Sequence, residues 1–345
     1  MSDALIAISI IWGIVFIYAV MGTMDFGAGF WSMIFLNKRE TNAANIANRY
    51  LSPTWEVTNV FIVAVVVAIY SFFPHAAFTL GTVLLIPGSL ILLLLAIRSA
   101  FLVFSNIANE YRRVLTYISG ISGLLIPALL ISVLPITHGN FVDFSDGKQS
   151  LNMGELFTSP NEYAFVGFAI SSTLFLSALL LADYSKVSND FDAYAVYRRT
   201  AIMIGPFTII MAFLILFTMR TEASWLYTNI MDNYPLLILS SVFFIIGIIA
   251  LFLPSKKGKK GLPRISVIAV VIQYLVAAYV YGNAHLPYIV YPEVTIESGF
   301  TDPSSFRAVF ATYIVGFSIL VPGFIYFWRL FMKDKEYLRQ GNPND

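Results

Sequence analysis

The chain has 345 residues, of which 58% are hydrophobic and only 12% are charged, and its formal net charge is +1. Soluble domains carry about twice that charged fraction, so the composition excludes a soluble globular protein and predicts a polytopic membrane protein without a nucleic-acid partner. There is no cysteine, which excludes disulfides, iron–sulfur clusters and thiolate ligation of haem.

We expect an all-α fold with about nine transmembrane helices in a single transmembrane domain, 1–345. Each apolar segment approaches the roughly 20 residues that cross a hydrocarbon core of about 30 Å. The predicted spans are 4–36, 53–73, 76–104, 114–136, 161–182, 200–219, 234–253, 265–284 and 306–331. We predict two pseudo-symmetric four-helix bundles, 1–136 and 161–284, followed by a ninth helix at 306–331.

Prolines mark the predicted helix boundaries and kinks. Three of them stand where helices are expected to begin: Pro53, Pro235 and Pro263. Four others fall inside spans and predict kinks, which neighbouring helices accommodate in a membrane: Pro87, Pro127, Pro206 and Pro322.

Basic residues give the predicted orientation. Of the 21 Lys and Arg, 17 lie in the loops after odd-numbered spans or in the C-terminal tail; the opposite side has only Lys148, Arg220 and Arg307. Because cytoplasmic loops are enriched in Lys and Arg, we predict an N-terminus outside and a cytoplasmic C-terminus. The run 256–261 is either a topology determinant or a binding site for anionic lipid.

The three histidines, His75, His138 and His285, fall at the outer ends of spans or in outer loops. No two of them share a helix at a spacing that would face one site. We therefore expect no haem, copper or other metal site in this chain. Two long outer loops, 137–160 and 285–305, are expected to cap a site or to meet another subunit.

Asp25 lies about two-thirds of the way along the first apolar run. A charged side chain at the bilayer centre costs roughly 2.5–3.5 kcal/mol on insertion scales, so Asp25 needs a partner, a water-filled cavity or a proton. Gly27 and Gly29 would let another backbone approach closely. Two interpretations are open: a packing cluster around a neutral or paired aspartate, and a site that handles protons or substrate.

Three ionisable residues are expected to converge in the cytoplasmic half of the membrane. Asp25 lies in the inner half of the first span, Glu56 in the first turn of the second, and Arg98 near the inner end of the third. The arginine would lower the cost of burying a carboxylate. The group is either a structural ion pair that fixes helix register or an acid chain that admits protons from the cytoplasm.

Two motifs carry a family resemblance. The stretch Met24-Asp-Phe-Gly-Ala-Gly29 resembles the Gly-Phe-Asp-(Phe/Met)-Gly-Val-Gly signature in the first helix of subunit II of cytochrome bd quinol oxidases. The stretch Asn48-Arg-Tyr-Leu-Ser-Pro-Thr-Trp-Glu56 is similar to that family's Asn-x-Ile-x-Pro-x-Trp-(Asp/Glu). Arg98 and the segment 286–292 are weaker similarities, and the length and the span count agree with the whole subunit.

The resemblance implies a bacterial plasma-membrane complex that reduces O₂ to water with electrons from quinol. Haems b and d, or haem b alone, would belong to subunit I. This chain would bind no cofactor, carry no catalytic residue, stabilise subunit I and contribute to proton delivery. Its other expected partners are quinol, membrane lipid and a small single-helix subunit.

The resemblance also assigns roles to residues. Asp25 and Glu56 become candidate proton-path residues, and Arg98 becomes their electrostatic partner. The positions that support the motifs are Gly27, Gly29, Pro53, Trp55, Thr58 and Asn59.

The chain departs from the family pattern at Thr23, Met24 and Ala28, and in the run Val57-Thr-Asn-Val-Phe61, where the family has Gly/Ala-Asn-(Gln/Glu)-Val-Trp. These departures suggest a divergent branch such as the cyanide-insensitive type. The alternative function is a stand-alone secondary transporter that uses an intramembrane Asp/Arg pair.

Overall fold

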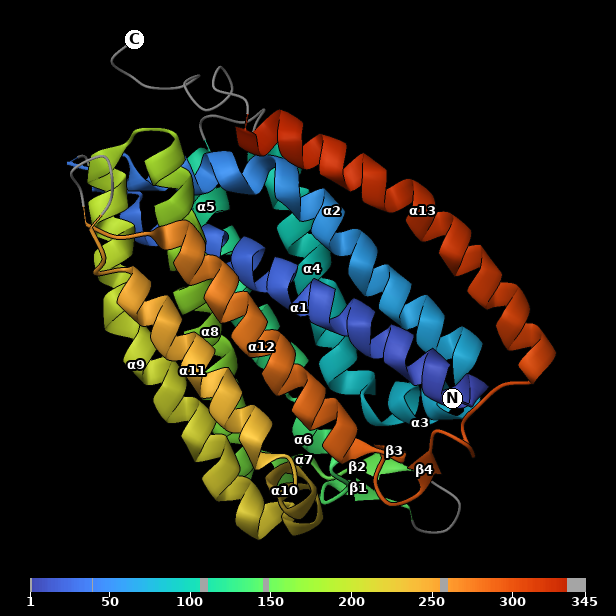
Figure 1. Cartoon of the computed structure of the whole chain (residues 1–345). Coiled ribbons are helices and arrows are strands. Elements are labelled where there is room, and N and C mark those ends of the chain that lie inside the picture. The colour runs from blue at the N-terminus through green and yellow to red at the C-terminus, as the bar shows by residue number, and fades with distance from the viewer. Residues whose placement is uncertain (1, 39, 106–110, 145–148, 255–259, 334–345) are drawn as a thin grey trace.

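The computed structural model describes every residue except 1, 39, 106–110, 145–148, 255–259 and 334–345, and it is predominantly helical (Figure 1). In chain order the elements are α1 (Asp3–Phe35), α2 (Ala43–Phe72), α3 (Pro74–Val83), α4 (Leu85–Ser105), α5 (Arg112–Ile131), α6 (Val133–Thr137), β1 (Val142–Asp143), β2 (Ser150–Leu151), α7 (Met153–Thr158), α8 (Pro160–Val187), α9 (Phe191–Glu222), α10 (Ser224–Met231), α11 (Tyr234–Ala250), α12 (Pro263–His285), β3 (Tyr288–Val290), β4 (Val294–Thr295) and α13 (Pro303–Lys333).

The prediction of an all-α membrane protein with about nine spans is confirmed. Among the described residues, eight helices are long and apolar enough to cross a membrane, and the bent pair α10 and α11 gives a ninth. These two helices meet at 77°, so α10 lies across the end of the bundle (Figure 1). The strands form two short antiparallel pairs, β1 with β2 and β3 with β4, in the connections at that end.

The third predicted span, 76–104, is wrong as a single helix. The structure has α3 ending at Val83 and α4 beginning at Leu85. Pro87 gives the physical reason, because proline has no N–H to donate to the carbonyl group four residues earlier, which is that of Val83.

The predicted helix start at Pro53 is also wrong, since α2 already begins at Ala43. The additional turns bury Ala43 and Ile46 in the core shared with α8 and α9. α9 likewise begins at Phe191, before the predicted residue 200. The Tyr197 hydroxyl donates to the carbonyl oxygen of Ala43 at 2.7 Å, so the two helix extensions stabilise each other.

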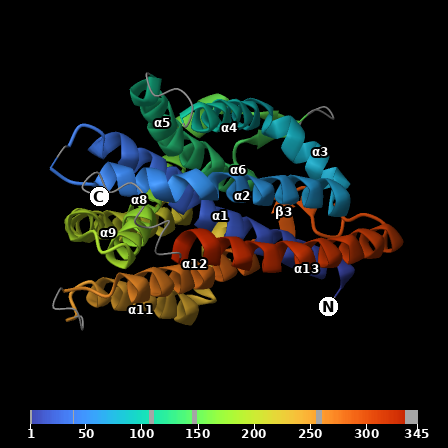
Figure 2. The same ribbon diagram turned by 90° about the horizontal axis from the view of Figure 1, so that it is seen from above.

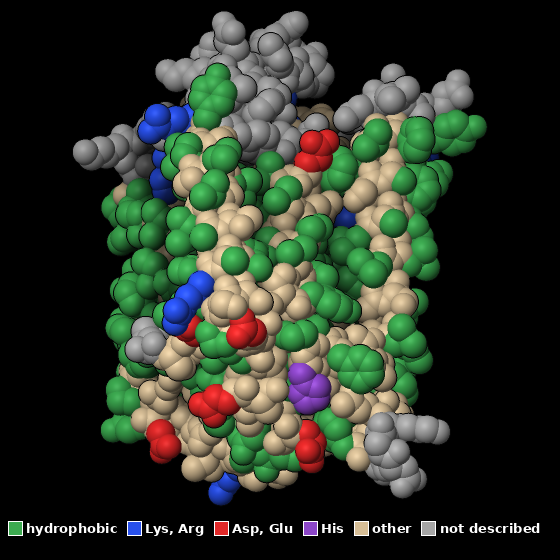
Figure 3. Space-filling model, turned by 90° about the vertical axis from the view of Figure 1, so that its right-hand side faces the viewer, with side chains coloured by type: hydrophobic (Ala, Val, Ile, Leu, Met, Phe, Trp, Pro, Cys, Tyr) green, Lys and Arg blue, Asp and Glu red, His purple; other side chains and the backbone are tan. Residues whose placement is uncertain are grey.

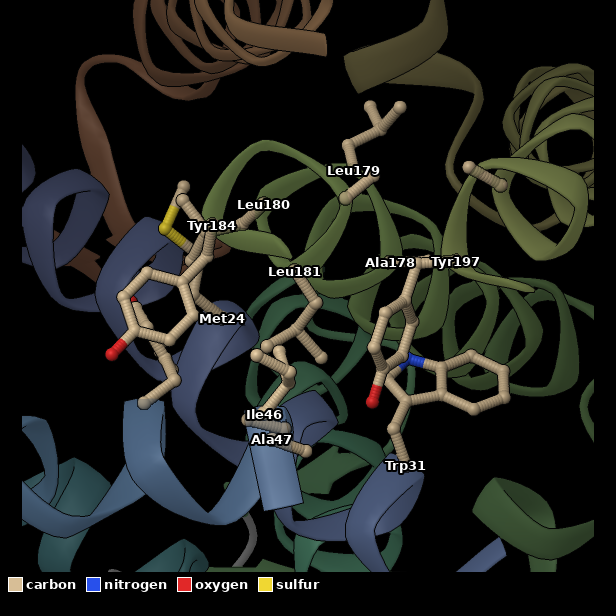
Figure 4. Close-up of a cluster of buried hydrophobic side chains, with 14 of the residues drawn as sticks. Met24, Trp31, Ile46, Ala47, Ala178, Leu179, Leu180, Leu181, Tyr184 and Tyr197 are labelled. Carbon is tan, nitrogen blue, oxygen red and sulfur yellow. The ribbon is translucent and has the colours of Figure 1, made fainter. Parts of the chain in front are cut away.

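α8 lies at the centre of the fold and packs against α1, α5, α9 and α12. Figure 4 shows part of this core, with side chains from α1, α2, α8 and α9 packed together. In the view from above, α4 and α5 lie at one edge of the helix array and α11 at the opposite edge (Figure 2). The division into two pseudo-symmetric four-helix bundles stays a prediction.

The two long loops that were expected to cap a site pack on each other. The Tyr291 backbone N–H donates to the carbonyl oxygen of Thr137 at 3.0 Å, which joins the loop after α12 to the end of α6. The Trp225 ring of α10 stacks on Tyr291 with the ring centroids 4.4 Å apart. Together with the two strand pairs, these contacts close one end of the helix array.

α13 leaves a broad apolar surface exposed. It packs mainly on α2 and α1, and the Tyr313 hydroxyl donates to the carbonyl oxygen of Ala64 at 3.0 Å. None of its most apolar stretch is buried within this chain. Figure 3 views the molecule from the right-hand side of Figure 1, where α13 lies, and shows hydrophobic side chains spread over most of its height. Such a surface suits lipid or another membrane chain.

Candidate functional site

Asp25 is buried inside the helix array and is paired. Only 3% of the residue is exposed. The Thr54 hydroxyl of α2 donates to its Oδ1 at 3.0 Å, and Arg98 Nη2 of α4 lies 3.7 Å from its Oδ2. The carboxylate therefore has a hydrogen-bond donor on one side and a cation on the other.

Arg98 is equally buried, with 2% of the residue exposed, and its guanidinium group is held by α1 and α5. Its Nη1 donates to the backbone carbonyl oxygen of Ser119 in α5 at 2.6 Å, and lies 3.1 Å from that residue's hydroxyl. Its Nη2 donates to the backbone carbonyl oxygen of Asp25 at 3.1 Å. The guanidinium carbon also lies 5.2 Å from the centre of the Phe26 ring. A buried charge is tolerated when it is both paired and hydrogen-bonded, as here.

Gly29 leaves space for Arg98, and Gly27 leaves space for the approach of α8. A Cβ at Gly29 would lie 2.8 Å from Arg98 Nη1, so a side chain there would displace the guanidinium group. A Cβ at Gly27 would lie 2.7 Å from the carbonyl oxygen of Thr173 in α8, and closer still to Ser177. The absence of a side chain at Gly27 thus allows α1 and α8 to pack closely.

Replacing Gly27 with alanine is therefore expected to destabilise the protein by about 1–3 kcal/mol, the usual cost of overpacking. Gly13→Ala is the matched control, because it lies in the same helix and its Cβ would have nothing within 4 Å. Alanine is favoured over glycine in a helix by about 1 kcal/mol, so the control should be neutral or stabilising. Thermal unfolding of the detergent-solubilised variants measures both. Equal melting temperatures for the two would contradict the close approach of α1 and α8.

Glu56 does not join the buried pair. It is exposed on α2, whereas Thr54 and Thr58 of the same helix are buried. The Thr58 hydroxyl donates to the Thr54 carbonyl oxygen at 3.1 Å. Asn59 Nδ2 lies 3.4 Å from the Ser99 hydroxyl.

Trp55 and Pro53 also belong to the second sequence motif. Trp55 is half-buried and packs against the core shared with α8 and α9. The side chain of Pro53 lies outside the described residues, although the helix backbone runs through this position.

Sequence reasoning missed a second polar cluster, at the end of the helix array that the two loops close. The rings of His138 and His285 lie 6.1 Å apart, although the residues are far apart in sequence. His138 Nε2 is 2.8 Å from the Tyr281 hydroxyl, and its Nδ1 is 3.4 Å from Asn161 Nδ2. The Asn161 Oδ1 accepts a hydrogen bond from Thr218 at 3.0 Å. No spacing along the chain indicated this cluster, because only the folded loops bring the two histidines together.

The environment of His138 disfavours its charged form. Burial, and next the neighbouring His285, lower the pKa of His138 from 6.5 to about 3. His138 therefore binds a proton below about pH 6.5 in the unfolded chain, whereas in the folded chain it stays neutral down to about pH 3. The free energy of unfolding is therefore unaffected by this group above pH 6.5. Below that pH it falls by about 1.4 kcal/mol for each pH unit, until the pH reaches the pKa of His138 in the folded chain.

We expect the solubilised protein to lose about 2 kcal/mol of stability between pH 7.5 and pH 5 from this group. His138→Gln should flatten that part of the pH dependence, whereas His75→Gln, at an exposed position, should leave it unchanged. Melting temperatures recorded across this pH range give the comparison. An unaltered slope in His138→Gln would show that another group is responsible.

The described part of the chain contains no group of three or more His, Asp or Glu side chains placed to hold a metal ion. The Asp25 and Arg98 pair is buried, with 3% and 2% of the two residues exposed. A carboxylate enclosed among helices, beside hydroxyl groups and a fixed cation, is suited to holding and passing a proton.

Comparisons with known proteins agree with this architecture. The family model for subunit II of the cytochrome bd terminal oxidase matches residues 4–331. A Bacillus subtilis (strain 168) protein, named for subunit II of a cytochrome bd menaquinol oxidase, is 64% identical over 341 residues, which is 98% of each chain. A chain in the structure of the bd oxidase from Geobacillus thermodenitrificans is 35% identical with a TM-score of 0.82, and the match covers 97% of this chain and 100% of that one. These matches do not favour a secondary transporter.

Proposed function

Because this chain belongs to the cytochrome bd terminal oxidase subunit II family, we propose that it joins a haem-bearing subunit I in a complex that reduces O₂ to water with electrons from menaquinol. The family itself makes the chain a membrane-bound subunit of a quinol oxidase. The observation that supports the finer proposal is the match to the B. subtilis protein, which extends over nearly all of both chains.

Asp25 is the group that we propose to deliver protons. Reduction of O₂ to water consumes protons, and a haem site within the bilayer needs ionisable or hydrated groups to receive them. Asp25 is buried between helices, and the cation of Arg98 offsets the cost of its charge. We propose that Arg98 keeps the carboxylate in place while protons enter and leave.

Glu56 is the proposed entry group. An exposed carboxylate near the start of a membrane-spanning stretch of α2 is costly beside lipid. We propose that subunit I covers this side of α2 together with the apolar face of α13. Glu56 would then lie at the boundary between the two subunits, where it can accept protons from the cytoplasmic side.

The haems, b with d or b alone, are proposed to belong to subunit I. Both histidines that approach each other here use their ring nitrogens for hydrogen bonds. His285 Nδ1 lies 2.9 Å from the Tyr288 carbonyl oxygen, and His138 contacts Tyr281 and Asn161. His285 Nε2 also lies 3.4 Å from the Thr137 hydroxyl, so each ring has a polar group beside both of its nitrogens, whereas an axial ligand needs one nitrogen free. Haem held by the partner would supply the oxygen and electron chemistry, and this chain would supply support and protons.

We propose a location in the bacterial plasma membrane, with the N-terminus outside and the C-terminus in the cytoplasm. Basic side chains support this orientation at the end where α8 meets α9. Lys186 Nζ donates to the Gly261 carbonyl oxygen at 2.6 Å, and Arg198 Nε donates to that of Leu251 at 2.8 Å. Of the run 256–261, a candidate for lipid binding, residues 256–259 lie outside the described residues. A small single-helix subunit is a further proposed partner.

Affinity purification of the tagged chain in mild detergent tests the proposal. We expect a larger subunit to co-purify, and a reduced-minus-oxidised visible spectrum to show haem b, with an additional far-red band if haem d is present. Quinol-dependent O₂ consumption by the preparation should be fastest with menaquinol analogues. A colourless preparation of a single chain would contradict the proposal.

A further inference from the structure

Tyr18 lies on the same side of α1 as Asp25. The two residues are seven positions apart, which is close to two full turns, or about 10 Å along the helix axis. Tyr18 is near the middle of the long helix Asp3–Phe35 and is 7% exposed. Its hydroxyl oxygen is buried and has no hydrogen-bond partner among the described residues.

The ring of Tyr18 packs beside Gly22 on the face of α1 that carries Asp25. Its Cε2 atom lies 3.9 Å from the position of a Cβ at Gly22, one turn closer to Asp25. The hydroxyl group interacts electrostatically with both Asp25 and Arg98. Against α2, the ring belongs to a cluster with Phe61.

The hydroxyl group of Thr58 in α2 lies, along the helix axis, between Asp25 and Tyr18. Because α1 and α2 are consecutive antiparallel helices, the hydrogen bond from Thr54 to Asp25 sets their register. Thr58 is one turn further along α2 in the direction of Tyr18, and it is 1% exposed. A hydroxyl that donates one hydrogen bond keeps its acceptor lone pairs, so Thr58 can still accept a hydrogen bond after donating to Thr54.

We propose that Tyr18 is the next proton-carrying group beyond Asp25, linked to it through water bound beside Thr58. This inference rests on the proposed role of Asp25. A buried hydroxyl without a partner costs about 1–3 kcal/mol, and buried water commonly satisfies such groups by making about three hydrogen bonds. Asp25, Thr58 and Tyr18 provide polar partners from two helices.

The proton balance is simple. The phenol hydroxyl of Tyr18 accepts a proton from the water on the Asp25 side as it gives its own proton to a second water molecule on its other side, which carries that proton onward. The Tyr18 hydroxyl then rotates back, and the carboxyl group of Asp25 returns a proton to the water on its side. No bond other than O–H changes, and Tyr18 ends each passage in its starting state. A phenylalanine at this position cannot take part, although it fills nearly the same volume.

Tyr18→Phe in the intact oxidase complex tests the inference. We expect O₂ consumption per haem to fall by about fivefold or more, as for loss of a proton-transfer group, with a larger solvent isotope effect in D₂O and an unchanged haem spectrum. Tyr274→Phe is the matched control. Its hydroxyl is also buried, but Tyr274 belongs to α12 and interacts with Ser172 rather than with Asp25.

Thr58→Val provides a second variant of nearly equal volume, and it should also slow O₂ consumption and raise the isotope effect. Wild-type turnover and isotope effect in Tyr18→Phe would overturn the inference, and so would equal slowing in Tyr18→Phe and Tyr274→Phe. The proposed function would stand in either case if removal of the Asp25 carboxylate slows turnover. If removal of that carboxylate also has no effect, the proposed role of Asp25 fails together with this inference.

Discussion

Asp25→Asn and Arg98→Met, introduced separately, are each expected to destabilise the solubilised complex by about 3–5 kcal/mol, because each leaves one buried charge without its partner. Neither side chain reaches solvent, since they are 3% and 2% exposed. Asparagine can still accept the hydrogen bond from Thr54, so the loss in Asp25→Asn reports the missing charge more than a missing contact.

The double variant Asp25→Asn/Arg98→Met should recover most of the lost stability, since it buries no charge. Chemical or thermal unfolding of the four proteins gives the coupling energy directly. Arg264→Met is the surface control. Arg264 pairs with Asp183 at 3.1 Å, but its side chain is 63% exposed, and exposed pairs contribute about 0–1 kcal/mol. Losses in the two single variants no larger than in this control would show that the buried pair does not act as a unit.

The double variant Asp25→Asn/Arg98→Met should fold stably but should consume O₂ slowly. We expect its quinol-dependent O₂ consumption per haem to fall by about tenfold or more, because proton-transfer groups commonly contribute rate factors of about 10² or greater. A purely structural ion pair would instead give normal turnover once stability is restored. Asp25→Glu keeps a carboxylate one methylene away, and it should retain more activity than the double variant. Full activity in the double variant would assign the pair to helix register alone.

The sequence places Asp25 and Arg98 at a similar depth in the membrane, but it leaves open whether the arginine pairs with Asp25 or with Glu56. Asp25 and Arg98 are the ionisable residues deepest in the first and third apolar segments, and the cost of burying them separately favours pairing. Thr54 and Ser119, which hold them, were not predicted, because hydroxyl side chains are common in membrane helices and carry no charge that demands a partner.

Glu56 shows why depth alone does not predict contact. At about 100° per residue, Glu56 lies about 200° around α2 from Thr54, which faces Asp25. It therefore points away from the pair although it lies close to the level of Thr54 along the helix. The sequence alone gives the angle between Glu56 and Thr54 around the helix. Only the fold shows that Thr54 is the residue of α2 that faces Asp25.

The loops at the closed end of the helix array illustrate a different limit. Residues 137–160 and 285–305 were expected to cap a site or to meet a subunit. At this end His138 of the first loop contacts Tyr281 of α12, and His285, the last residue of α12, lies beside it. Irregular segments have no periodic pattern that gives their direction, so a contact between two of them depends on the tertiary fold.

The most direct test of the role of Asp25 is proton uptake during a single turnover. The fully reduced complex is mixed with O₂ in a weakly buffered solution that contains a pH-indicator dye, and haem oxidation is followed in the same experiment. In Asp25→Asn/Arg98→Met, we expect the bound haems to react with O₂ while proton uptake slows by about tenfold or more relative to the natural chain. Proton uptake at the unaltered rate, in a complex with its full haem content, would contradict proton delivery through Asp25.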